Sequence, residues 1–192
     1  MRVIYRKYLP GEDIPAADYF SRRKLVKYFS RETMAAVVCI GELLKGEVPS
    51  PETPFFFSCG ETEMMDIYKE ACMVFDKGEL KFDSSMFLER AITVISPLSH
   101  FKMMRNMAHC FISIEYGLKG DNAATMGSVS GLLVPAMLSE GRGDILIGAG
   151  KLHADGTAEG GFALVTAHEL KDCPMLESDG EAICFFRENY NI

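Results

Sequence analysis

Residues 95–131 read ISPLSHFKMMRNMAHCFISIEYGLKGDNAATMGSVSG, and they contain the local signals that decide the fold. Apolar residues recur at helical spacing through residues 99–115, which predicts a helix with one buried face. The members of this apolar stripe are Phe101, Met104, Ala108, Phe111 and Ile112. Residues 129–138 predict a second helix, in which Pro135 introduces a bend because its ring does not fit a straight helix interior.

Short apolar runs on both sides of this stretch predict strands that are buried on both faces. They cover residues 55–59, 144–148, 161–166 and 182–186, and a first strand covers residues 3–5. Further helical spacing is found in residues 33–44 and 63–75, whereas residues 82–95 fit either a helix or a strand. Strands that alternate with helices in this way predict an α/β fold, with one sheet covered on both sides.

Composition is typical of one packed domain spanning residues 1–192. Hydrophobic residues make up 48% and charged residues 24%, which excludes a disordered chain. The net charge of −7 argues against nucleic acid and anionic membranes as main partners, because both attract clustered Lys and Arg. One basic group stands out, and we interpret it as a solvated face in preference to a docking patch for an acidic carrier protein. It consists of Arg22, Arg23, Lys24 and Lys27.

The six cysteines indicate a reducing compartment. None of them forms a C-x-x-C pair, and most lie in apolar runs, so buried free thiols explain them better than disulfides or zinc. The first residues contain no basic-then-apolar leader, and no apolar run approaches the length of a membrane span. The sequence therefore predicts a cytoplasmic protein without a membrane span.

Residues 95–131 also resemble the segment of β-ketoacyl synthases that leads to their nucleophilic cysteine. In that family a Ser-Pro turn starts a helix that carries an Asn and small residues. Ile-Ser, a Gly-Leu-x-Gly turn, a small-residue strand and Cys-x-Ser-Gly at the head of a buried helix then follow. The residues that match this pattern here are Ser96, Pro97, Asn106, Ala108, Ile112, Ser113, Gly117, Leu118, Gly120, Asn122, Ser130 and Gly131. The position of the nucleophile holds Ser128, or Gly127 or Val129 if the alignment shifts by one residue, and none of these is cysteine.

The resemblance extends over residues 53–166. Residues 144–150 resemble the family's strand after the nucleophile helix, and residues 159–165 resemble its Glu-Gly strand. It implies that residues 1–192 form one half of a thiolase-like fold. Such a half is a five-stranded mixed sheet with helices on both faces, and β-ketoacyl synthases contain two halves.

The same resemblance implies which chemistry to expect. A β-ketoacyl synthase needs a thiolate and two histidines, and both histidines come from its C-terminal half. The histidines of this chain, at positions 100, 109, 153 and 168, match neither of them. We therefore expect a non-catalytic β-ketoacyl-synthase-like protein, without cofactor or metal, in a fatty-acid, polyketide or aryl-polyene type pathway. It would pair with a ketosynthase or with itself and could contact an acyl carrier protein.

A dimer surface is expected around residues 101–122, because in the family the Asn-bearing helix and the strand before the nucleophile form the dimer contact. This segment is rich in large apolar side chains. They are Met103, Met104, Met107, Phe111 and Ile114. An apolar surface of this extent on a small domain usually marks a partner site.

The alternative is an enzyme, a small acyltransferase or thioesterase that acts on acyl-carrier-protein thioesters through Ser128 or Cys59. Ser128 could be a nucleophile at a helix N-terminus with an oxyanion hole, or simply the N-cap of the helix, which we favour. Cys59 lies at a strand end, but Glu61 would raise its pKa, which favours an inert buried thiol. A third possibility is a binding module for the carrier protein or its acyl chain, with methionines lining an adaptable pocket.

The roles of two histidines, His153 and His109, remain open. His153, Asp155 and Glu159 could ligate a metal, but a turn between two strands at Gly156 explains the same polar residues. His109 follows Arg105 by one helical turn, and we expect a core or interface histidine there rather than a catalytic one.

Overall fold

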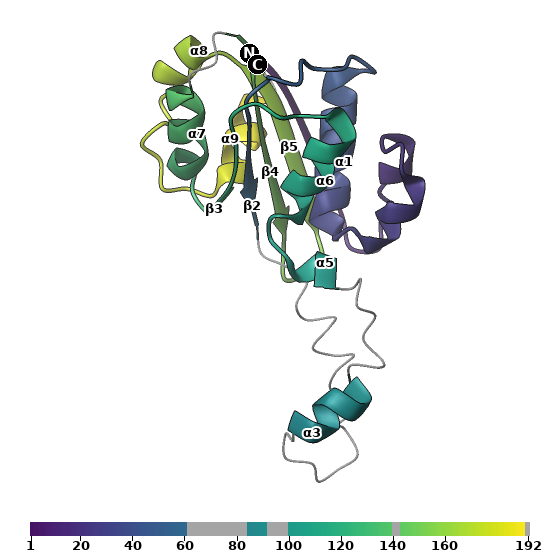
Figure 1. Ribbon diagram of the computed structural model, residues 1–192. Helices are drawn as coiled ribbons and strands as arrows, with labels where there is room; N and C mark the ends of the chain where they lie inside the picture. The colour runs from purple at the N-terminus through teal and green to yellow at the C-terminus, as the bar shows by residue number, and fades with distance from the viewer. Residues whose placement is uncertain (61–83, 92–99, 140–142, 191–192) are drawn as a thin grey trace.

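A computed structural model describes residues 1–60, 84–91, 100–139 and 143–190 (Figure 1). Within these ranges no helix has both the length and the apolar character needed to cross a membrane. The strands are β1 (Arg2–Tyr8), β2 (Phe55–Cys59), β3 (Asn122–Met126), β4 (Ile145–Leu152) and β5 (Ala158–Val165). The α-helices are α1 (Arg31–Leu44), α3 (Ser84–Met86), α5 (His100–Met103), α6 (Met107–Tyr116), α7 (Val129–Leu138), α8 (Ala167–Lys171) and α9 (Ala182–Asn189). The remaining helical turns are η1 (Ala16–Asp18), η2 (Arg23–Tyr28) and η3 (Phe87–Ala91).

The strands form one mixed sheet in the order β1-β5-β4-β2-β3. Strands β3, β2 and β4 run parallel, with Phe55 opposite Asn122 on one side and Leu146 on the other. Strand β5 is antiparallel to both β4 and β1. The predicted α/β class with a five-stranded mixed sheet is therefore confirmed.

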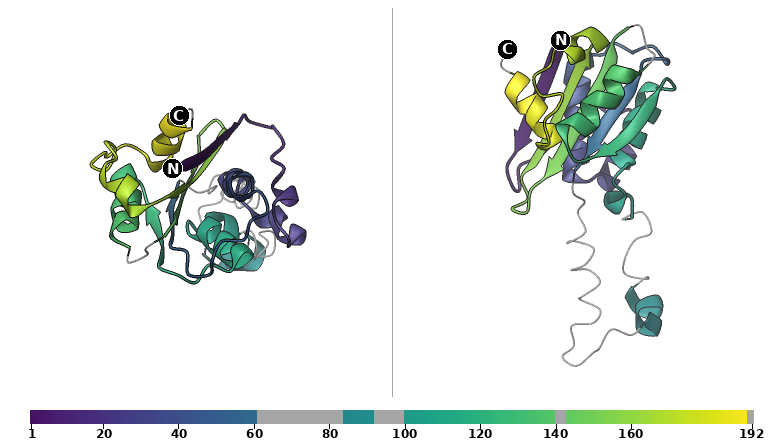
Figure 2. Two further views of the ribbon diagram at one scale, coloured as in Figure 1. Left: turned by 90° about the horizontal axis from the view of Figure 1, so that it is seen from above. Right: turned by 90° about the vertical axis from the view of Figure 1, so that its left-hand side faces the viewer.

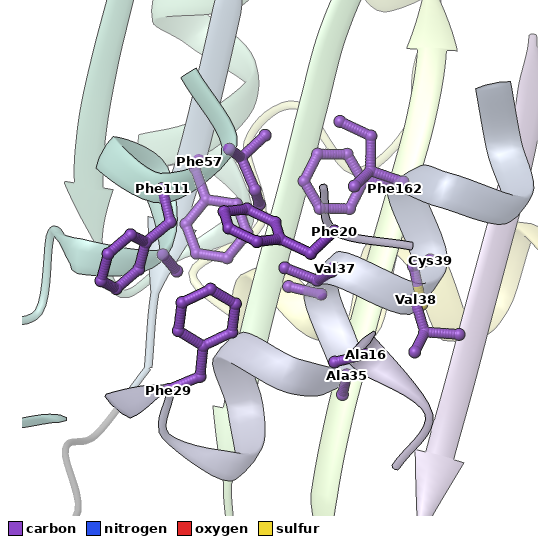
Figure 3. Close-up of a cluster of buried hydrophobic side chains, with 14 of the residues drawn as sticks. Ala16, Phe20, Phe29, Ala35, Val37, Val38, Cys39, Phe57, Phe111 and Phe162 are labelled. Atoms are coloured by element: carbon purple, nitrogen blue, oxygen red, sulfur yellow. The ribbon is translucent and has the colours of Figure 1, made fainter. Parts of the chain in front are cut away.

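Helices cover both faces of the sheet, as the view from above shows (Figure 2). Helices α1 and α6 lie on one face, where aromatic side chains from several elements pack together (Figure 3). Phe29 and Phe111, for example, have ring centroids 4.5 Å apart. Helices α7, α8 and α9 pack on the other face through a second apolar cluster that includes Leu132, Leu133 and Phe186. The two clusters explain why most residues of the central strands are apolar.

Two neighbouring glycines of β5 allow helices to approach both faces closely. Successive residues of a strand point to opposite faces, so Gly160 faces α1 and Gly161 faces α9. A Cβ at Gly160 would lie 2.5 Å from the backbone carbon of Ala35, and one at Gly161 would lie 2.3 Å from the ring of Phe186. At these two positions the backbone of α1 and the ring of Phe186 therefore pack directly on the backbone of β5.

The structure corrects two of the expected elements. Residues 182–186 form the start of helix α9 rather than a strand, and the fifth strand is β3. The single helix expected over residues 99–115 is two helices, α5 and α6, because residues 104–106 interrupt it. The helix expected over residues 63–75 lies outside the described residues, and of residues 82–95 only 84–91 are described, as helical turns.

Candidate functional site

A cavity of about 480 Å³ lies where the parallel strands β2, β3 and β4 end. Ligand sites of α/β sheets usually form at the carboxyl ends of parallel strands, so this is the natural place to look for chemistry. Its polar and charged lining consists of Ser58, Cys59, Arg105, Lys151, His153 and Glu181. Its apolar lining includes Met126, Leu152 and Ile183, and the backbone of three glycines contributes the rest of the wall.

Ser128 is the N-cap of helix α7, as the sequence predicts. Its Oγ accepts a hydrogen bond of 3.1 Å from the N–H of Gly131 and lies 3.0 Å from the Oγ of Ser130. Within the described residues no histidine forms a hydrogen bond with Ser128. A serine hydroxyl needs a positioned base to become a nucleophile, and this geometry supplies a cap instead.

The first backbone donors of α7 are already occupied by the loop that precedes α9. The N–H of Val129 donates to the carbonyl of Gly180 at 2.7 Å, and the N–H of Ser130 donates to that of Ser178 at 3.1 Å. In addition, the N–H of Ala182 donates to the carbonyl of Gly127. An oxyanion hole at this helix terminus would need the same N–H groups, so the loop would first have to leave.

Replacing Ser128 with alanine is expected to lower the free energy of unfolding by about 1 kcal/mol, because the N–H of Gly131 loses its acceptor. Chemical denaturation monitored by circular dichroism measures this change. The matched control is Ser128→Asp, which keeps a capping oxygen and should stay close to the wild type. Equal stability of all three proteins would contradict the capping role.

Cys59 lines the floor of the cavity but is only 4% exposed. Burial, with a smaller contribution from the carboxylate of Glu32, raises the pKa of its thiol to about 12, although Arg105 acts in the opposite direction. The thiol is therefore protonated at neutral pH and is a poor nucleophile. Glu61, to which the sequence assigns this effect, lies outside the described residues.

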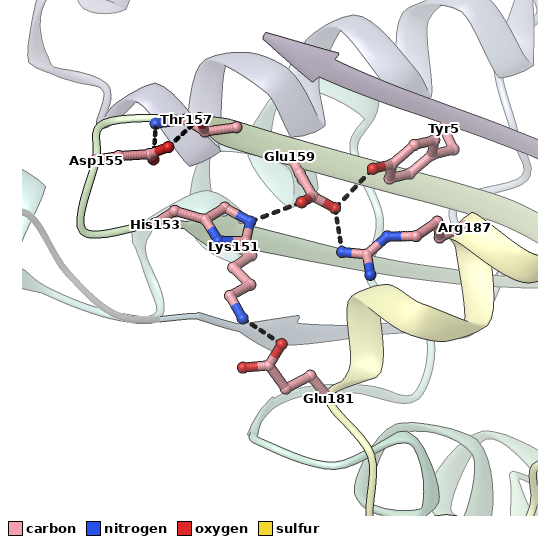
Figure 4. Close-up of polar contacts among 8 residues, drawn as sticks. All are labelled: Tyr5, Lys151, His153, Asp155, Thr157, Glu159, Glu181 and Arg187. Carbon is pink, nitrogen blue, oxygen red and sulfur yellow. Dashed lines mark hydrogen bonds and ion pairs between the residues drawn. The ribbon is translucent and has the colours of Figure 1, made fainter. Parts of the chain in front are cut away.

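A buried carboxylate, Glu159, holds three elements together beside the cavity (Figure 4). Its side chain is 2% exposed and accepts hydrogen bonds from Tyr5 Oη at 2.7 Å and from Arg187 at 2.7 Å, while His153 Nε2 lies at 2.6 Å. Burial alone would raise the pKa of Glu159, but the hydrogen bonds from Arg187, Tyr5 and His153 outweigh it and lower the pKa. Tyr5 responds in the opposite sense, since burial and the hydrogen bond to Glu159 raise its pKa to about 12.

The structure separates the three residues considered as metal ligands. His153 and Glu159 bond each other, whereas Asp155 accepts hydrogen bonds from the N–H and hydroxyl of Thr157 in the turn between β4 and β5. Gly156 occupies the left-handed region in this turn, with φ of 89°. Within the described residues no group of three or more His, Cys, Asp or Glu side chains is arranged to hold a metal ion.

The other histidines lie away from the cavity lining. His109 is buried and stacks on Phe55 with a centroid distance of 4.8 Å, and its burial lowers the pKa. This agrees with the core histidine that the sequence predicts. His168 is exposed on α8 beside Asp172, and His100 begins α5.

Several site residues were not foreseen from the sequence. Lys151 and Glu181 form an ion pair at the cavity, and Tyr5 and Arg187 complete the shell of Glu159. No local pattern marks them, since the partners are separated by 28 to 154 residues. The basic residues Arg22, Arg23, Lys24 and Lys27 are exposed on and next to η2, as a solvated face requires.

No model of a known protein family matches this chain, and no curated protein matches it either. What the chain does is therefore inferred from three features of the molecule. They are the occupied N-terminus of α7, the cavity beside it and strand β3, which is an edge strand of the described sheet.

Proposed function

We propose that this chain is a non-catalytic β-ketoacyl-synthase-like protein that pairs with a second copy or with a ketosynthase in the cytoplasm. The observation that carries the proposal is the N-terminus of α7. The position of the family nucleophile holds a capping serine, and the adjacent N–H groups already donate to Ser178, Gly180 and Ser128. A condensing enzyme needs a thiolate and free donors at this place.

The order of elements around Ser128 supports the resemblance on which the proposal rests. A small-residue strand (β3) precedes the serine, a buried helix (α7) follows it, and β4 and then the Glu-Gly strand β5 come next. This is the order that the resemblance implies for half of a thiolase-like fold. The pathway types that it brings with it are fatty-acid, polyketide or aryl-polyene synthesis.

Strand β3 offers the surface for pairing, because among the described strands it is an edge strand with β2 as its one neighbour. The N–H of Phe55 donates to the carbonyl of Asp121, and bonds alternate along a parallel ladder. The N–H and C=O groups of Asn122, Ala124 and Met126 therefore point away from β2. An open row of this kind accepts another strand.

Exposed apolar side chains accompany this edge. Met126 is 65% exposed at the end of β3, and Ile114 is 55% exposed on α6, which packs on the neighbouring strand β2. Met104, in the connection between α5 and α6, is 48% exposed. Apolar area next to a free strand edge favours a protein partner over solvent.

Replacing Ala124 with proline is expected to weaken pairing by at least about ten-fold, because it removes an outward N–H while leaving the ladder with β2 intact. Size-exclusion chromatography with light scattering over a concentration series measures the dimer constant, alone and with a co-expressed ketosynthase. The control is Val48→Glu, which changes an exposed side chain of the loop between α1 and β2 and should leave pairing unchanged. A wild-type protein that stays monomeric in both settings would contradict the proposal.

The competing enzyme, an acyltransferase or thioesterase using Ser128 or Cys59, is tested on the same protein. Incubation with acyl thioesters and intact-protein mass spectrometry is expected to show neither an acyl adduct nor released thiol. Ser128 lacks a bonded base among the described residues, and the raised pKa of Cys59 keeps its thiol protonated. An adduct that disappears in Ser128→Ala or Cys59→Ala would replace the non-catalytic proposal with this enzyme.

A further inference from the structure

The cavity at the ends of β2, β3 and β4 has more basic than acidic groups in its wall. Among the described residues of its lining, Arg105, Lys151 and His153 are basic and Glu181 is the one acidic side chain. His153 is committed to Glu159, which leaves two cations from separate elements, Arg105 before α6 and Lys151 in β4. This bias stands against the net charge of −7 of the whole chain.

Lys151 shows which chemical group this wall accepts. Its ammonium forms an ion pair with a carboxylate, that of Glu181 at the start of α9 (Figure 4). The side chain of Glu181 is 59% exposed, so the pair is largely screened by water and contributes little stability. The carboxylate of a ligand can therefore replace that of Glu181 on Lys151 at a small cost in free energy.

Arg105 forms no such ion pair with any residue that the structure describes. Within the described residues its guanidinium contacts the sulfur of Met126 at 3.4 Å, and no carboxylate lies within ion-pair distance. Arg105 also lines the same cavity as Cys59, and its charge opposes in small part the rise in the pKa of that thiol, which burial causes. A planar guanidinium binds carboxylates through two parallel hydrogen bonds.

We propose that this cavity binds a small dicarboxylate, with one carboxylate on Arg105 and the other on Lys151 in exchange for Glu181. The two cations lie on the wall of one cavity, and its volume of about 480 Å³ accommodates a compact organic acid. This site shares Met126 with the pairing edge on β3, but the two cations that define it lie outside that strand. Ala124→Pro tests pairing and Arg105→Met tests ligand binding, so failure of one proposal can be told apart from failure of the other.

Succinate is the probe, propionate is its singly charged counterpart, and inorganic phosphate is the competing type of anion. Titration followed by NMR chemical shifts at low salt is expected to show saturable succinate binding at least about ten-fold tighter than that of propionate. Arg105→Met should reduce succinate affinity by about ten-fold, to the level of propionate, because one charge-assisted contact is lost. Lys171→Met, on α8, is the matched control and should bind like the wild type.

Glu181→Gln is expected to increase the affinity for succinate. A variant that merely unfolds would lose affinity, so this result separates the two explanations. The substitution frees Lys151, and succinate should bind about two- to five-fold tighter than to the wild type. The proposal is overturned if succinate does not saturate below about 10 mM, which corresponds to very weak binding. It is equally overturned if phosphate binds more tightly than succinate, or if Glu181→Gln has no effect.

Discussion

Replacing Arg187 with methionine is expected to lower the free energy of unfolding by about 3 kcal/mol at neutral pH. The reason is the asymmetry of burial within its ion pair with Glu159. The arginine side chain is 45% exposed, whereas the carboxylate is 2% exposed. Loss of the arginine therefore leaves a buried charge that Tyr5 and His153 compensate only in part, and removing one partner of a buried pair is strongly destabilising.

The control for this prediction removes the other partner. Glu159→Gln takes away the buried charge and leaves an arginine that reaches water, so its cost should be smaller, about 1 to 2 kcal/mol. The double variant Arg187→Met with Glu159→Gln should be more stable than Arg187→Met alone. Urea denaturation of the four proteins gives the cycle, and a cost of Glu159→Gln as large as that of Arg187→Met would contradict the asymmetry.

The difference in the free energy of unfolding between the wild type and Arg187→Met depends on pH through the pKa of Glu159. Hydrogen bonds from Arg187, Tyr5 and His153 lower this pKa below the value of 4.5 that an unperturbed glutamate has. The stability contributed by the ionised carboxylate is thus complete above pH 4.5 and is lost as the pH falls through the lowered pKa. The free energy of unfolding of Arg187→Met should lie below that of the wild type by a constant amount from about pH 7 to 5. This difference should become smaller below that range.

Burial on both faces explains which strands the sequence could predict. Residues 55–59, 144–148 and 161–166 are apolar runs within central strands, and all three correspond to observed strands. Residues 182–186 have the same appearance, but in α9 Ala182, Ile183 and Phe186 lie on one helical face against β5. A five-residue apolar run does not distinguish these cases, and the polar continuation through Asn189 belongs to the helix.

Strand β3 does not stand out as an apolar run in the sequence, because little of it is buried. As an edge strand it buries little, and its sequence NAATM has few large apolar residues. Only the resemblance to β-ketoacyl synthases places a small-residue strand before Ser128.

The N-cap at Ser128 could be predicted because its signal is local, whereas the shell of Glu159 could not. Tyr5 and Arg187 approach Glu159 only after β1 and α9 have docked on β5. The cavity cations Arg105 and Lys151 have the same origin, since the sheet brings their elements together. Residues that meet only through tertiary contacts show no characteristic spacing in the sequence, so they could not be predicted from it.

Replacing Gly160 with alanine is expected to lower the free energy of unfolding by about 3 kcal/mol or more, at the upper end of overpacking effects. The added Cβ would lie 2.5 Å from the backbone carbon of Ala35 and 2.6 Å from the nitrogen of Ala36. These are backbone atoms in the middle of α1, so no side-chain rotation relieves the overlap. The whole helix has to move away from β5, and the contact of Cys39 Sγ with the carbonyl of Gly160 lengthens.

A matched control separates this overlap from the general effect of losing a glycine. Gly143 is exposed, and a Cβ there would meet no atom of the described residues within 4 Å, so Gly143→Ala should change stability by less than about 0.5 kcal/mol. Because α1 packs against β5 in the cluster that contains Phe162, a shift of the helix also disturbs the aromatic side chains around Phe162. Loss of near-ultraviolet circular dichroism in Gly160→Ala, but not in Gly143→Ala, is therefore expected. A cost for Gly160→Ala below about 1 kcal/mol would show that α1 is not held as closely against the sheet as the structure places it.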